Sequence, residues 1–171
     1  MQSTQPPLTA LLQAIADELE RFADALSDTQ WHAFVETEQR TVGQLIHHVA
    51  WAWNVESDAF RAIAGGVADS GWTQEWLDAQ NADQARKSAA LDRCHIMHDY
   101  RNARDRAIAF VTNLSPAELT RTGIHMPGEP ERTVAEWIEA CLVGHPREHL
   151  DGIRQWTRGN IGTRETGGNG K

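Results

Sequence analysis

The chain has 171 residues, 40% of them hydrophobic, which is enough for one domain with a real core but short for two. Sixteen basic against 24 acidic residues give a formal net charge of −8, which argues against nucleic acid or an anionic membrane as the main partner. No stretch approaches roughly 18 uninterrupted apolar residues, so we expect no membrane span. Cys94 and Cys141 form no CxxC pair and the N-terminus does not resemble a signal peptide, so we expect a reducing, cytoplasmic location.

Hydrophobic periodicity predicts four amphipathic helices and no convincing strand. The helices are expected over about residues 8–26, 41–64, 82–113 and 133–157. Four long helices in one small domain indicate an all-α fold, a four-helix bundle. We assign this domain to residues 1–158 and expect the glycine-rich residues 159–171 to form a flexible tail.

Helix ends and loops define the connections between these helices. Thr41 is an N-cap candidate for the second helix, and Thr133 for the fourth, where Glu136 three residues on completes a capping-box pattern. The connection over residues 65–81 spans on the order of 50 Å if extended, enough to run the length of the bundle. The second and third helices can therefore be parallel and joined by a long crossover.

Histidines fall on the core-facing stripes of two of these helices. On a helical wheel centred on Leu45, His48 and Glu56 lie on the apolar stripe, whereas His47 lies on the far face. In the fourth helix, His145 and His149 lie within about 20° of the centre of the stripe, stacked one turn apart.

Two interpretations of these histidines compete. A single core-facing histidine is more often a hydrogen-bonded core residue than a ligand. A pair at i,i+4 together with a third on another stripe favours a metal, because three histidines with an open position are a standard catalytic zinc arrangement. Nickel, iron and manganese also accept imidazole.

The remaining histidines are weaker candidates. His95 and His98 form an i,i+3 pair that lies off the core stripe, so we interpret them as flanking or surface residues. His32 and His125 fall in predicted loops, where either could line a pocket mouth.

Pro146 lies between the two histidines of the fourth helix. Inside a helix it removes one backbone hydrogen bond and could produce a kink that tilts the imidazoles toward a common point. Alternatively, Gly144, His145 and Pro146 break the helix, which would lose the i,i+4 register.

Two segments, TVGQLIHHVAWAW and GHPREHLDGIRQW, resemble the DinB-like superfamily of metal-binding four-helix bundles. The resemblance covers roughly residues 8–156. It implies an up-down-down-up bundle and a divalent transition metal, zinc or nickel, held by His48, His145 and His149. It also implies a homodimer, for which Trp51 and Trp137 are candidate interface residues because they lie off the core stripes; partial cover by loops is the alternative.

The same resemblance implies an activity class. Members of the superfamily resemble metal-dependent S-transferases that use a low-molecular-weight thiol such as bacillithiol or mycothiol, and others look like maleylpyruvate isomerases. We therefore expect a metal-activated thiol or water that attacks an electrophilic small molecule, as in detoxification or a stress response. Glu56 is the candidate partner that orients a ligating imidazole, or the candidate general base; an ion pair with an arginine is the alternative. Cys141 could approach the metal, but a small core residue is the alternative.

Two other functions remain open from the residues. One is a binding protein that sequesters a small molecule between Trp53, Trp72 and Trp76, with a vestigial metal site. The other is a structural or interaction module whose core histidines are simply hydrogen-bonded.

Overall fold

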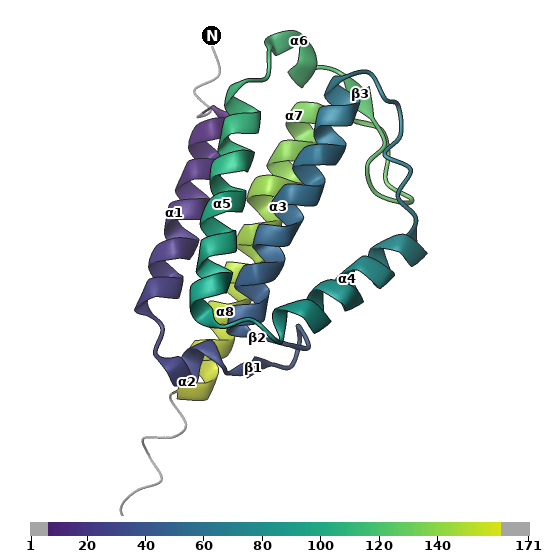
Figure 1. The fold of residues 1–171 in the computed structure, drawn as a ribbon. Helices are drawn as coiled ribbons and strands as arrows, with labels where there is room; N and C mark the ends of the chain where they lie inside the picture. Colours follow the sequence, from purple (N-terminus) through teal and green to yellow (C-terminus); the bar gives the residue numbers. More distant parts are fainter. Residues whose placement is uncertain (1–6, 162–171) are drawn as a thin grey trace, which may run out of the picture.

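Four long helical segments run side by side in the computed structural model, which describes residues 7–161 without the side chains of 158–161 (Figure 1). They are α1 (Leu8–Ala25), α3 (Val42–Ala64), α5 (Arg93–Thr112) and a composite last helix. The last helix consists of α7 (Val134–Trp137), the π-helical segment η1 (Ile138–Gly144) and α8 (His145–Ile161). The expected four-helix bundle is confirmed. The residues assigned to a flexible tail largely lie outside the described residues, since α8 extends to Ile161.

The helix directions follow the expected topology. The chain runs one way along α1, the opposite way along α3 and again along α5, and returns along α7 to α8 (Figure 1). The two central helices α3 and α5 are thus parallel, which is the up-down-down-up order with a crossover between them. α3 and α5 also make the most extensive helix–helix contact in the described part of the chain.

The crossover differs from the expectation. Residues 65–81 are not simply a loop: α4 (Gln74–Ser88) begins within them, and the single helix expected over 82–113 is two helices. Thr73 caps α4 and Asp92 caps α5, each accepting a hydrogen bond from a backbone N–H in its helix's first turn. α4 buries only Gln84 and Ser88. The hydrophobic stripe therefore belongs to α5 alone, and α4 is a polar helix outside the bundle.

Short elements fix where two bundle helices start. The strands β1 (Phe34–Val35) and β2 (Arg40–Thr41) form one antiparallel hairpin, and β3 (Thr122–Gly123) and β4 (Arg132–Thr133) form another, although no strand was expected. Each hairpin ends on a threonine that caps the next helix. Thr41 and Thr133 both form the complete capping box with the residue three positions on, which confirms them as N-caps. The remaining short helices are α2 (Asp28–Trp31) and α6 (Pro116–Leu119).

The core fills the space between the four long helical segments. Its largest fully buried side chains come from every one of them: Leu12, Ile15, Leu19, Leu45, Ile46, Trp53, Phe60, Ile63, Ile96, Tyr100, Trp137 and Ile138. Within the described residues, none of the helices has the length and apolar character needed to cross a membrane.

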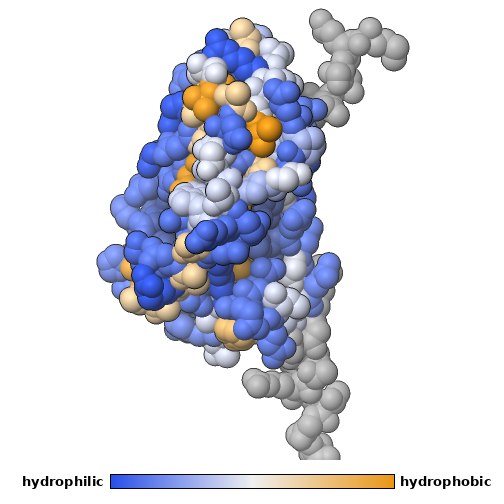
Figure 2. All heavy atoms as spheres, turned by 90° about the vertical axis from the view of Figure 1, so that its right-hand side faces the viewer, coloured by the Kyte–Doolittle hydropathy of each residue, from blue (hydrophilic) through white to orange (hydrophobic). Residues whose placement is uncertain are grey.

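Trp137 is a correction to the expected dimer face. Its side chain is only 2% exposed and its Nε1 donates to the carbonyl of Gly123 at 2.8 Å, because the β3–β4 hairpin covers this side of α7. Trp51 is half-buried and stacks on His48. The face that carries α4 is largely hydrophilic, with hydrophobic residues gathered toward the end of the molecule opposite β1 and β2 (Figure 2).

Candidate metal centre

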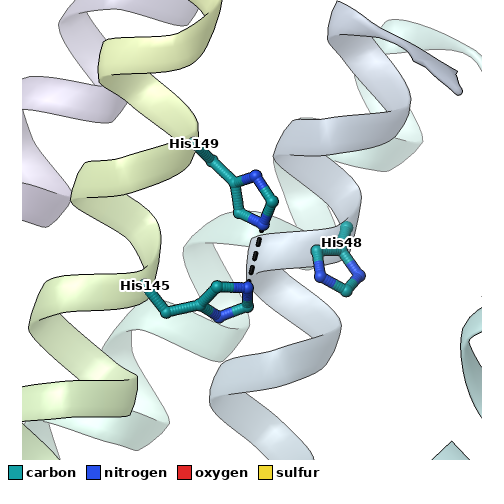
Figure 3. Close-up of side chains that lie close together, drawn as sticks. All are labelled: His48, His145 and His149. Atoms are coloured by element: carbon teal, nitrogen blue, oxygen red, sulfur yellow. Dashed lines mark hydrogen bonds between the residues drawn. The ribbon is translucent and has the colours of Figure 1, made fainter. Parts of the chain in front are cut away.

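His48 on α3 meets His145 and His149 on α8 inside the bundle (Figure 3). One ring nitrogen from each histidine can be chosen so that all three nitrogens lie within 4.8 Å of one another. The Nε2 atoms of His145 and His149 are 2.9 Å apart, and the ring of His48 stands edge-on to both, with centroid separations of 5.4 and 5.2 Å. The structure thus brings together all three histidines that the sequence selects as metal ligands.

The π-helical segment η1 delivers this pair to α3. At its end the N–H of His145 donates to the carbonyl of Ala140, five residues back, so the helix is widened by one residue per turn rather than broken. From His145 onward the helix is α, and the two imidazoles keep the i,i+4 register. The alternative in which Gly144 to Pro146 break the helix is wrong.

Pro146 also changes the backbone hydrogen bonding just before the two histidines. It has no N–H to donate to the carbonyl of Leu142, four residues back. That carbonyl instead accepts a hydrogen bond from the indole Nε1 of Trp53 on α3, at 3.0 Å. A side chain on the helix that carries His48 therefore binds the backbone of η1, just before the two histidines of α8.

Burial keeps the three imidazoles neutral. Desolvation, with added repulsion from Arg40 and from neighbouring imidazoles, lowers the pKa of His48 to about 2. Desolvation is also the main cause that lowers the pKa values of His145 and His149 to about 4. Neutral imidazoles present the lone pairs that a metal requires. The Nδ1 of His48 is buried without a hydrogen-bond partner, which fits a ligand atom better than a satisfied core histidine.

Glu38 makes an outer contact that no pattern in the sequence predicts. It lies in the β1–β2 turn, and its Oε2 is 3.3 Å from the Nδ1 of His149, on the opposite side of the ring from His145. A carboxylate in this position orients a ligating imidazole and increases its basicity. Only the folding of the hairpin against α8 brings these residues together.

Glu56 lies away from the three histidines. It is two turns beyond His48 on α3, about 12 Å along the helix axis. Its side chain is 4% exposed, makes no ion pair with any described residue, and groups with His125 and Cys141. Burial raises its pKa well above the ordinary value, which favours the uncharged carboxylic acid. Its catalytic role stays a prediction. The alternative, an ion pair with an arginine, is absent among the described residues.

The other histidines divide as follows. His95 and His98 are exposed, as expected. His47 faces away from the site, and its Nδ1 is hydrogen-bonded to Gln84 of α4 at 2.8 Å. His125 does not line a pocket mouth: it is 1% exposed in the β3–β4 loop.

The tryptophans proposed as pocket walls do not form one wall. Trp53 is fully buried and packs on Tyr100, whereas Trp72 and Trp76 pack on each other, with ring centroids 4.6 Å apart. Trp72 also packs on His125, at 4.4 Å.

The fold and the site together define a four-helix bundle with an inward-facing cluster of three histidines from its second and last helices. The model of the DinB superfamily matches residues 11–153, and the chain belongs to this family. A search of curated proteins finds no match.

A solved structure gives the same fold. YfiT from Bacillus subtilis, described as a probable metal-dependent hydrolase with an unusual four-helix bundle topology, is similar with a TM-score of 0.72 and 16% sequence identity. The similarity covers 88% of this chain and 84% of that one. At this identity it supports the arrangement of helices, and it agrees with the up-down-down-up order seen here.

Proposed function

We propose that the protein is a metal-dependent enzyme in which His48, His145 and His149 hold a divalent transition metal, with zinc or nickel favoured. The observation that carries the proposal is the convergence of three neutral imidazoles from α3 and α8, of which His48 is buried and His145 and His149 are partly buried. Membership of the DinB superfamily and the description of the B. subtilis protein agree with it.

The residues of the chain fit such a centre. Three imidazoles leave at least one position open, which is the pattern of catalytic rather than structural sites. Glu38 holds the ring of His149, and Trp51 stacks on the ring of His48 at 5.6 Å. When bound, a divalent metal lowers the pKa of a coordinated water or thiol so that a nucleophile forms at neutral pH.

Transfer of a low-molecular-weight thiol to an electrophilic small molecule is the reaction we place first, with a role in detoxification or stress. Hydrolysis is the second candidate, and the description of the B. subtilis protein favours it. Both reactions need the same centre and differ in whether the thiol or water is the nucleophile. The predicted role of Glu56 as a base would have to act over two turns of α3 from His48, about 12 Å along the helix axis. Glu38, which contacts His149, is the described carboxylate nearer to the centre.

Metal content per chain tests the proposal. Protein made without a histidine tag is analysed by elemental mass spectrometry beside His48→Ala, His149→Ala and the exposed control His98→Ala. Loss of about one equivalent of zinc or nickel per chain in the first two variants, but not in the control, supports the centre. Thiol transfer and hydrolysis are then assayed on the same samples. A wild-type protein that binds no divalent metal at these histidines even after reloading would leave a small-molecule binding protein as the better function.

A further inference from the structure

A second group of buried polar side chains lies further along the bundle. Glu56 of α3, His125 of the β3–β4 loop and Cys141 of η1 each have a potential ligand atom within 4.8 Å of another in the group. Cys141 is one turn before His145, and Glu56 is two turns beyond His48. The two groups are therefore successive levels of the same pair of helices, separated by roughly 6 to 12 Å along their axes.

Three polar atoms of Glu56 and His125 in this second group lack protein partners. Glu56, His125 and Cys141 are 4%, 1% and 7% exposed. The Oε2 of Glu56 and both ring nitrogens of His125 are buried without a hydrogen bond. Buried polar atoms are nearly always satisfied in folded proteins, so three unsatisfied atoms at one place indicate a ligand that they bind.

The surroundings of His125 hold its ring in place without satisfying it. Its backbone carbonyl accepts from the Oγ of Ser70 at 2.6 Å, and its ring packs between Trp72 and Phe60, at 4.4 and 4.6 Å. Trp137 is also close, at 5.4 Å, but its Nε1 already donates to Gly123. The imidazole is thus fixed by aromatic contacts, and its nitrogens remain available.

We propose that Glu56, His125 and Cys141 form a second divalent transition-metal site, distinct from the three-histidine centre, with zinc as the favoured ion. One thiolate, one imidazole and one carboxylate are all ligands that zinc accepts. A thiolate and a carboxylate also balance the charge of a divalent cation, so the loaded site is neutral overall and suits a deeply buried position. The three-histidine centre, by contrast, contributes no negative charge from its ligands.

Burial favours the neutral forms of these three groups in metal-free protein. Burial raises the pKa values of Glu56 and Cys141 and lowers the pKa of His125 to about 4. Binding of a divalent metal must displace the protons of the carboxylic acid and the thiol, so about two protons are released per metal bound at this site.

Cobalt(II) distinguishes the two sites, because only the second contains sulfur. We expect titration of tag-free, metal-free protein with cobalt(II) to give an intense thiolate-to-cobalt charge-transfer absorption in the near ultraviolet. This absorption should disappear in Cys141→Ser and persist in His48→Ala, which keeps the second site, and in the exposed control Cys94→Ser. The expected metal content is about two equivalents in wild type and about one in Cys141→Ser and in His48→Ala.

Folding and proton release complete the test. Circular dichroism establishes that Cys141→Ser and Glu56→Gln keep the helical fold, and proton release is measured in the His48→Ala background, where only the second site remains. Absence of the charge-transfer absorption in folded wild-type protein, or its persistence in Cys141→Ser, would overturn the second site. Failure of the three-histidine centre gives a different result, an absorption and metal content that His48→Ala leaves unchanged.

Discussion

Tyr100 is the only tyrosine of the chain, and its side chain is fully buried on α5. Its Oη donates to the carbonyl of Ala16 on α1 at 2.7 Å, and burial raises its pKa above the ordinary value. A raised folded-state pKa means that this group's contribution to stability is complete below about pH 10 and is lost as the pH rises further. We expect Tyr100→Phe to lower the free energy of unfolding by about 1 kcal/mol at neutral pH.

The same variant distinguishes the effect of Tyr100 ionisation on stability from the effect of its hydrogen bond. Urea unfolding of wild type and Tyr100→Phe is compared at neutral pH and at about pH 11, above the ordinary tyrosine pKa. The difference between the two proteins should shrink or reverse at the higher pH. A constant difference would mean that the phenol does not titrate differently in the folded and unfolded states.

Glu38 is the residue whose removal best tests the orientation of a histidine ring. Its carboxylate contacts the Nδ1 of His149, whose Nε2 faces His145. We expect Glu38→Gln to weaken metal affinity by roughly 10- to 100-fold while leaving the fold intact. The measurement is a dissociation constant from competition with a chelator.

Glu36 provides the matched control for that prediction. It is an exposed glutamate in the same β1–β2 turn, and no contact joins its carboxylate to a histidine in the described residues. Glu36→Gln should bind metal as wild type does. Equal affinities in Glu36→Gln and Glu38→Gln would show that the contact with His149 has no role in metal binding.

At the scale of elements, the junction of η1 and α8 depends on a bond from another helix. Pro146 leaves the carbonyl of Leu142 without its usual partner, and Trp53 of α3 donates to it. Loss of a hydrogen bond to a buried carbonyl costs about 1–3 kcal/mol. The deviation from α-helical geometry is therefore tied to the packing of α3 against the last helix.

A double-mutant cycle tests this coupling. Trp53→Phe should destabilise the protein, partly by leaving a cavity and partly by leaving the Leu142 carbonyl unbonded. Pro146→Ala restores an N–H four residues on from Leu142, so Trp53→Phe should cost less in that background. The cavity contribution cancels in the cycle, and free energies of unfolding that simply add would contradict the coupling.

At the scale of the whole molecule, the three-histidine centre links the N-terminal part of α3 to the start of α8. A ligand that binds only the folded chain stabilises it, by about 2.7 kcal/mol at a free concentration 100 times the dissociation constant. We expect zinc or nickel to raise the melting temperature of wild type, measured by circular dichroism. His48→Ala should retain only the smaller shift due to any second site, and identical shifts in both proteins would contradict a centre that includes His48.

Assembly of whole molecules stays a prediction. The homodimer rests on the family resemblance and on two tryptophans, of which Trp137 lies in the interior. Sedimentation equilibrium of the wild-type protein measures the association state directly. A monomer at all concentrations would contradict the predicted homodimer.

Periodicity along single helices was sufficient for part of this structure. The four helices and the inward direction of His48, His145 and His149 follow from where apolar residues recur within a helix, which is a local property. The order of the helices was expected from the family resemblance, with a crossover long enough to allow it. The N-caps at Thr41 and Thr133 could also be predicted from the sequence, because a capping box involves residues only three apart. Periodicity did not reveal that the third predicted helix is two helices, because the residues of α4 and of the start of α5 all favour helix. The two differ only in packing: the hydrophobic stripe of α5 lies in the core, whereas α4 is polar.

Tertiary structure alone decided the contacts between distant segments. Glu38 and His125 lie in hairpin loops, where no periodicity indicates direction, and they reach α8 and α3 through the folding of β1–β2 and β3–β4. Glu56 could be placed on a core-facing stripe from the sequence, but its partners could not. A helical wheel fixes the angle of a side chain about one axis, whereas its neighbours depend on how several axes and loops pack in three dimensions.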